Sequence, residues 1–286
     1  MRFTEEVVSF DCTGAMLVGI LSRPSIPPST GVVVVVGGPQ YRVGSHRQFV
    51  LLARELAAAG YAVLRFDVRG MGDSGGESPR FENTGADIAQ AIGVLQRSVP
   101  TVRQVALWGL CDGASAALLY CHASPDTRVR ALCLVNPWVR SEASLARTHV
   151  KHYYLQRLRQ PEFWQKLLRG GIAPGALAGL AHSVKLALGG TREPSTVTHT
   201  FQQRMAAAWN AFSGRIFLLL SEDDYVAKEF VEHVSKDLAW QNTLQHPRLV
   251  RHDEPRADHT FSSAVLRARV AQLTLQLGLQ DLRTDR

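Results

Sequence analysis

Leu107-Trp108-Gly109-Leu110-Cys111-Asp112-Gly113 has the spacing of the G-x-S-x-G nucleophile elbow, with cysteine in the place of serine. A short apolar run precedes it at residues 105–108, and a run typical of a helix follows at residues 114–120. A strand, a sharp turn and a helix are the setting that this motif requires. The alternative interpretation is an inert thiol beside a glycine turn, since free cysteine is among the most buried residue types.

Strand-like and helix-like segments alternate on both sides of this motif. The unbroken valine run at residues 32–36 is typical of a central strand that is buried on both faces of a parallel sheet. Further strands are predicted at 61–66, 105–108, 129–135, 215–220 and 248–251, and helices at 46–59, 84–97, 114–120, 227–240 and 262–279. Residues 5–22 supply one or two antiparallel edge strands. The pattern predicts an α/β fold, with a mostly parallel central sheet and helices on both faces.

The alternation stops after Asn136-Pro137 and resumes only at residue 215. The intervening stretch is rich in Arg, Tyr and Trp and has helical segments but no convincing strand. We therefore expect a core made of residues 1–137 and 213–286, with a helical cap inserted over residues 138–212.

Composition excludes several classes of protein. The 286 residues are 45% hydrophobic and 20% charged, as in ordinary globular proteins, and they carry a formal charge of +7. The Arg residues are scattered, which argues against a nucleic-acid surface. The amino-terminal stretch lacks a signal-peptide pattern, and no apolar run approaches the roughly 20 residues of a membrane span. We expect a cytoplasmic protein without stable membrane insertion; the sequence does not indicate its oligomeric state.

The four cysteines are Cys12, Cys111, Cys121 and Cys133, and they show no C-x-x-C spacing. This argues against a metal site or a redox pair. We expect no metal and no cofactor. If Cys111 is a nucleophile, three cysteines remain, which argues against a disulfide framework.

Reactive residues follow three of the predicted strands. Open parallel sheets gather their sites at the carboxyl ends of strands. Cys111 follows the strand at 105–108, Asp223 and Asp224 follow the strand at 215–220, and His259 follows the last strand. An imidazole that takes the proton of Cys111 makes a thiolate, and an acid behind the histidine fixes its tautomer. We predict a triad of Cys111, His259 and Asp224, with Asp223 as the alternative acid.

The turn after the first parallel strand is expected to complete the oxyanion hole, which needs two backbone N–H donors. One donor is Asp112, immediately after the nucleophile. Pro39 has no N–H, so Gly38 is the first candidate for the other donor and Gln40 the second. Beyond this site we expect Tyr41, Arg42 and Trp138 to line the substrate pocket.

Five segments together carry a family resemblance: VVVVVGGPQ, RFDVRGMGDSGG, GLCDG, SEDD and ADHTF. They resemble the α/β-hydrolase superfamily along nearly the whole chain, and the triad order nucleophile, acid, histidine is the order of that fold. GGPQYRVGSHRQF with GLCDGASAALLY resembles the exosortase A system-associated hydrolases of type 1, in the cysteine-nucleophile variant. The resemblance implies an α/β-hydrolase fold, hydrolytic activity and a context of exopolysaccharide metabolism.

The resulting prediction is a hydrolase that cleaves an ester or thioester through an acyl-cysteine intermediate. Its substrate would be a small molecule or a carrier-bound acyl group, and the basic residues of the expected cap, Arg140, Arg147, Lys151, Arg157 and Arg159, would suit an anionic carrier. Two alternatives stay open. An acyltransferase would use the same intermediate, and a non-catalytic scaffold of this fold would bind a partner protein.

Overall fold

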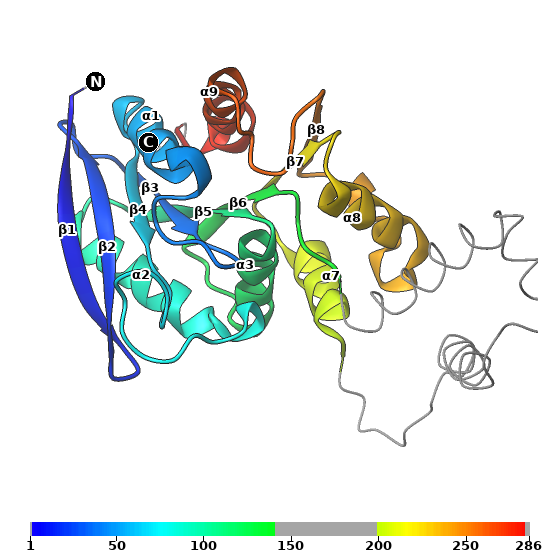
Figure 1. Cartoon of the computed structure of the whole chain (residues 1–286), viewed down its shortest axis with the longest axis horizontal. Coiled ribbons are helices and arrows are strands. Elements are labelled where there is room, and N and C mark those ends of the chain that lie inside the picture. Colours follow the sequence, from blue (N-terminus) through cyan, green and yellow to red (C-terminus); the bar gives the residue numbers. More distant parts are fainter. Residues whose placement is uncertain (1, 141–198, 284–286) are drawn as a thin grey trace, which may run out of the picture. The chain divides into compact units, whose positions relative to one another are not determined.

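The computed structural model describes residues 2–140 and 199–283. The chain divides into one unit of Met1–Val139 with His199–Arg286 and a second unit of Arg140–Thr198. The first unit contains an eight-stranded sheet of order β1-β2-β4-β3-β5-β6-β7-β8 (Figure 1). Its strands are β1 (Phe3–Cys12), β2 (Ala15–Pro24), β3 (Thr30–Val35), β4 (Ala62–Phe66), β5 (Gln104–Leu110), β6 (Val129–Val135), β7 (Arg215–Ser221) and β8 (Leu249–Glu254).

The expected sheet is confirmed. Strands β3 to β8 run parallel to one another, whereas β1 pairs antiparallel with β2, and β2 pairs antiparallel with β4. The valines of β3 alternate between the two faces: Val33 and Val35 belong to one core, and Val32 and Val34 to the other. Each is fully buried, which contributes about 1.5–3 kcal/mol per side chain relative to exposure.

Helices cover both faces of the sheet. One face carries α1 (Gln48–Ala58) and α9 (Ala264–Leu273), which lie side by side (Figure 1). The other face carries α2 (Gly85–Ser98), α3 (Asp112–Ala123), α7 (Phe201–Ala211) and α8 (Tyr225–Lys236). In α2 the buried residues Ile88, Ile92 and Leu95 recur at helical spacing, which is why this segment presents one apolar stripe to the sheet. None of the helices that the structure describes is both long and apolar enough to cross a membrane.

The last part of the expected cap, which forms α7 (Phe201–Ala211), belongs to the core unit. We expected the insertion to extend to residue 212, but α7 packs against α3 and belongs to the first unit. Its Trp209 is fully buried and contacts the rings of Phe230 and Trp240. Helical periodicity cannot distinguish a cap helix from a core helix, because the partner that buries the apolar face lies elsewhere in the chain. The rest of the expected cap, residues 141–198, lies outside the described residues.

Candidate active site

The predicted elbow forms a tight turn between β5 and α3. Cys111 has φ 60° and ψ −126°, a conformation that costs of order 1–3 kcal/mol for a residue with a side chain. The glycines on either side permit it: a Cβ on Gly109 would lie 2.5 Å from the nitrogen of Ala114, and one on Gly113 would lie 2.4 Å from the carbonyl oxygen of Val35. The turn therefore needs glycine at both positions, because backbone atoms fill the space of a side chain.

Hydrogen bonds hold Cys111 in this conformation. Its N–H donates to the Val135 carbonyl at 2.9 Å, and its carbonyl accepts from Ala114 N–H at 3.1 Å. Trp138 N–H also donates to the Cys111 carbonyl, at 3.3 Å, and the Ser115 hydroxyl donates to the Trp138 carbonyl at 2.7 Å. The backbone of Trp138 is thus fixed directly beside the nucleophile turn, and its side chain is half-buried.

The predicted acid and base are in direct contact. His259 lies in the loop between β8 and α9, and its Nδ1 lies 2.8 Å from Asp224 Oδ2. Asp224 lies three residues after the end of β7, at the start of α8, and is almost fully buried, whereas Asp223 is exposed. The same carboxylate caps α8 by accepting the N–H groups of Val226 and Ala227. Asp224 can therefore hold the imidazole in one orientation while the helix holds the carboxylate.

Asn136 is a residue of this region that the sequence reasoning did not assign. It follows β6, is fully buried and has a φ of 44°. Its amide accepts from Ser221 N–H at 2.8 Å, donates to the Ser221 hydroxyl at 2.9 Å and reaches the His259 carbonyl at 3.4 Å. It thereby joins the strand of the acid to the loop of the histidine. The only local signal was an Asn-Pro pair at the end of a buried strand.

The turn of Gly37 and Gly38 lies against the first residue of α3. Gly38 has a φ of 60°, and its N–H donates to Asp112 Oδ2 at 2.8 Å. The predicted oxyanion donor Gly38 is therefore bound to a side chain. Gln40, the second candidate, is half-buried, and no described residue donates a hydrogen bond to its buried Oε1.

The two other predicted substrate-binding residues differ in their contacts. Tyr41 is 46% exposed, and the guanidinium of Arg42 lies 6.0 Å from the centroid of its ring. Arg42 is mostly buried, and its guanidinium forms ion pairs with Asp67 and Asp73. These pairs hold the pKa of Arg42 above its usual value even though burial lowers it. Arg42 thus attaches the segment after the Gly37–Gly38 turn to the loop that follows β4.

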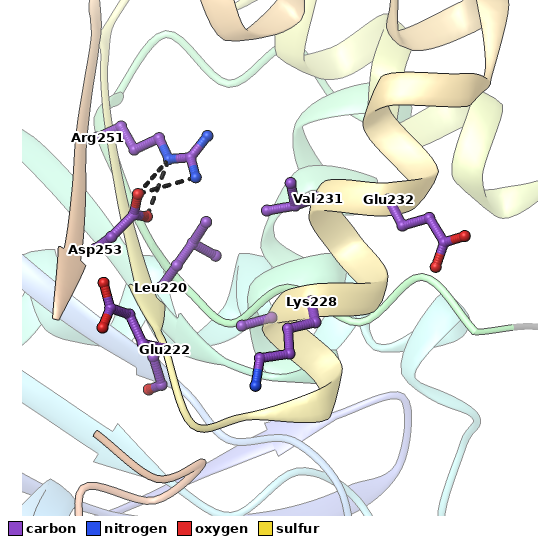
Figure 2. A pocket seen from close by; sticks show the side chains of 9 residues that line it. Leu220, Glu222, Lys228, Val231, Glu232, Arg251 and Asp253 are labelled. Carbon is purple, nitrogen blue, oxygen red and sulfur yellow. Dashed lines mark hydrogen bonds and ion pairs between the residues drawn. The ribbon is translucent and has the colours of Figure 1, made fainter. Parts of the chain in front are cut away.

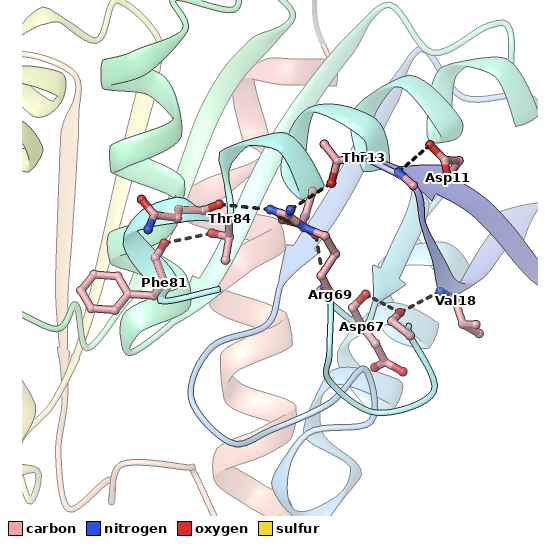
Figure 3. A network of polar contacts seen from close by, with 11 residues as sticks. Asp11, Thr13, Val18, Asp67, Arg69, Phe81 and Thr84 are labelled. Carbon is pink, nitrogen blue, oxygen red and sulfur yellow. Dashed lines mark hydrogen bonds and ion pairs between the residues drawn. The ribbon is translucent and has the colours of Figure 1, made fainter. Parts of the chain in front are cut away.

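That loop is held by a further polar network (Figure 3). The Asp67 carbonyl accepts the Ser74 hydroxyl at 2.7 Å, and Ser74 in turn accepts Val18 N–H at 2.9 Å. The guanidinium of Arg69 binds the buried carboxylate of Asp87 on α2. These contacts fix the glycine-rich loop against β2 and α2.

A hollow of about 360 Å³ lies between α8 and the ends of β7 and β8 (Figure 2). Its floor is apolar, and its rim carries the Arg251–Asp253 ion pair and Lys228. None of the predicted site residues lines it. Of the basic residues proposed to receive a carrier, Arg147, Lys151, Arg157 and Arg159 lie outside the described residues. Within residues 2–140 and 199–283 no cluster of three His, Cys, Asp or Glu side chains forms a metal site.

Solved structures resemble this chain along almost its whole length. An esterase of Pyrococcus furiosus superposes with a TM-score of 0.63 at 17% identity, covering 96% of this chain and 92% of its own. Dienelactone hydrolase from Anabaena variabilis gives 0.61 at 15% identity, covering 98% and 99%. Est1E from Butyrivibrio proteoclasticus, with ferulic acid bound, gives 0.59 at 15%, covering 94% and 98%. At these identities the likeness shows the α/β-hydrolase fold.

None of the curated proteins compared with this sequence matches it. A family model does match, over residues 27–186, and its family is described as serine aminopeptidase, S33, of the Hydrolase_4 type. The elbow here carries Cys111 where that description implies serine. The match spans more than half of the chain, from the first parallel strand past the elbow, so the chain belongs to this family of α/β-hydrolase enzymes.

Proposed function

We propose that this enzyme hydrolyses an ester or thioester through a triad of Cys111, His259 and Asp224. The observation that carries the proposal is the hydrogen bond between Asp224 and His259 at the sheet edge where the strained Cys111 turn also lies. A histidine oriented by a buried carboxylate is the arrangement that activates a nucleophile. The N-terminus of α3 adds the positive end of a helix dipole beside the thiolate.

The reaction has two steps. The Cys111 thiolate attacks the acyl carbon, the bond to the leaving alkoxide or thiolate breaks, and His259 gives that group its proton. A water molecule then attacks the acyl-cysteine, His259 accepts the proton of the water, and the free acid leaves as Cys111 is restored. A thiolate is a good nucleophile for both esters and thioesters. The context of exopolysaccharide metabolism is supported by the motif resemblance to the exosortase A system-associated hydrolases.

The test is the rate of Cys111 alkylation by iodoacetamide as a function of pH, followed by peptide mass mapping in the native protein and in His259→Ala. The other three cysteines, Cys12, Cys121 and Cys133, serve as internal controls. Burial raises the pKa of Cys121 and of Cys133 to about 12 and also raises the pKa of Cys12. We expect selective labelling of Cys111 well below about 8.5, the ordinary pKa of a thiol, and its loss in the variant. Labelling of Cys111 that is slow and indifferent to His259 would support a non-catalytic scaffold.

A second measurement identifies the reaction. p-Nitrophenyl acetate and acetyl-CoA are supplied to the native protein and to Cys111→Ala, and the products are analysed with and without added alcohols and thiols. Free acetate that depends on Cys111 is the expected product. Transfer of the acetyl group to the added acceptor in preference to water would instead indicate an acyltransferase.

A further inference from the structure

The side chain of Asp112 lies in the turn that is expected to form the oxyanion hole. Its Oδ2 accepts the N–H of Gly38 at 2.8 Å. The backbone N–H groups of Asp112 itself and of Gly113 also interact with the carboxylate and favour its charged form. The Gly38 N–H thus forms the hydrogen bond to this carboxylate, and two further backbone N–H groups act on it electrostatically, as where protein backbones bind anions.

Two of these three donors, Gly38 N–H and Asp112 N–H, are the two that we predicted for the oxyanion of the reaction. An oxyanion hole works because its donors point at the place where negative charge develops. Here the carboxyl group of Asp112 already occupies the Gly38 donor. A carbonyl oxygen of a substrate must therefore compete with the Asp112 carboxylate for the Gly38 N–H.

The backbone is shaped to admit this side chain. A Cβ on Gly37 would lie 2.0 Å from Asp112 Oδ1 and 2.3 Å from the nitrogen of Gly113, so only glycine leaves room for the carboxylate. Oδ1 is buried, and no described residue forms a hydrogen bond with it. One oxygen is thus held by the turn, while the other is removed from water without a partner. Such a half-satisfied carboxylate is held less firmly than a fully bonded one.

We propose that the Asp112 carboxylate is the resting occupant of the oxyanion hole, and that acylation of Cys111 requires this carboxylate to turn out or to lose its charge. The inference rests on the proposed function, since it concerns the acyl step of that reaction. In that step the sulfur–carbon bond forms and the carbonyl electron pair moves to the oxygen. This oxygen gains the Gly38 donor only when Asp112 releases it.

The charges around Asp112 give the pH dependence its direction. Burial raises the pKa of Asp112 above its ordinary value, and its interactions with the three N–H groups and with His259 offset only part of this rise. Among the described residues, His259 from the loop after β8 is the titratable group that acts on it electrostatically. A fall in pH neutralises the carboxyl and weakens its hold on the Gly38 N–H, which opens the hole.

The test compares two reactions of the same sulfur. Alkylation by iodoacetamide forms no oxyanion, whereas acylation by p-nitrophenyl acetate does, so the ratio of acylation rate to alkylation rate isolates the oxyanion hole. The ratio is measured against pH for the native enzyme, Asp112→Asn and Asp112→Ala, with Asp223→Asn as the matched control. Asp223 is an exposed carboxylate on another loop. Asp112→Asn keeps the shape of the side chain in case Asp112→Ala fails to fold.

We expect the ratio to rise about tenfold or more in Asp112→Ala, less in Asp112→Asn, and not in Asp223→Asn, since one oxyanion donor is worth about 10²–10³ in rate. The native ratio rises as pH falls, and this slope disappears in both Asp112 variants. An unchanged or lower ratio in folded variants whose Cys111 alkylates normally would overturn the inference alone. A Cys111 that neither reagent modifies selectively in the native enzyme would overturn the proposed function, and the inference with it.

Discussion

Replacement of Asp224 by asparagine separates the catalytic role of this residue from its structural one. The carboxylate accepts Val226 N–H at 3.1 Å and Ala227 N–H at 3.3 Å as the cap of α8, and it contacts His259 Nδ1 at 2.8 Å. Asparagine is as good a helix cap as aspartate. Its amide nitrogen, however, is a donor, so an amide that faces Nδ1 favours the wrong tautomer of the histidine.

The contacts of Asp224 set the expected size of both the loss of stability and the loss of acylation rate. For Asp224→Asn we expect a change of less than about 1 kcal/mol in the free energy of unfolding, because the cap is kept. Loss of a charged hydrogen bond costs about 1.5–3 kcal/mol, or roughly 10- to 100-fold in acylation rate. If the histidine takes the wrong tautomer, the loss of rate becomes larger and approaches the roughly 10⁴-fold found when the aspartate of a serine-protease triad becomes asparagine. Asp224→Ala should show the same kinetic loss and, in addition, lose about 1–2 kcal/mol of stability with the cap.

The assay is the pre-steady-state release of p-nitrophenol from p-nitrophenyl acetate, with urea denaturation of the same samples. Asp223→Asn is the matched control, since this exposed carboxylate lies one residue away and has no contact with His259 among the described residues. Acylation at the native rate in Asp224→Asn would refute the reasoning. An equal loss of rate in Asp223→Asn would refute it as well, because the loss would then come from the negative charge of the loop and not from the contact with His259.

Three further outcomes are expected. Gly113→Ala should lower the free energy of unfolding by about 1–3 kcal/mol, because its Cβ would lie 2.4 Å from the Val35 carbonyl. This loss should appear as a lower midpoint of urea denaturation, and an unchanged midpoint would contradict the prediction. The pKa of Asp126 falls to about 2, since hydrogen bonds from Arg128 outweigh the effect of burial. The stability that the charged carboxylate adds is therefore present above pH ~4 and lost towards pH 2. The free energies of unfolding of Asp126→Asn and of the native protein should accordingly converge as the pH approaches 2. Asn136→Ala should cost about 1–3 kcal/mol by leaving buried partners unpaired and should slow acylation, whereas a loss of stability alone would make its role purely structural.

The sequence by itself determined the strands and helices of the core and the order of the triad candidates along the chain. Apolar runs and helical spacing are local properties, so the valines of β3 and the stripe of α2 could be recognised without a structure. The glycines around Cys111 likewise indicated the elbow, because a turn of this kind leaves no room for a side chain on either side. The end of the cap could not be placed, since the contacts that bury α7 come from α3.

Tertiary structure decided which polar groups meet. Asp224 rather than Asp223 contacts a histidine 35 residues away, and Asp112 binds the N–H of a glycine 74 residues earlier. Arg42, which we expect to line the substrate pocket, forms an ion pair with Asp67. Each of these contacts depends on side-chain direction and on the approach of distant loops, which no local pattern encodes. Residue spacing therefore located the triad candidates at one sheet edge, but only the packing of that edge placed the Asp112 carboxyl against the expected oxyanion donor.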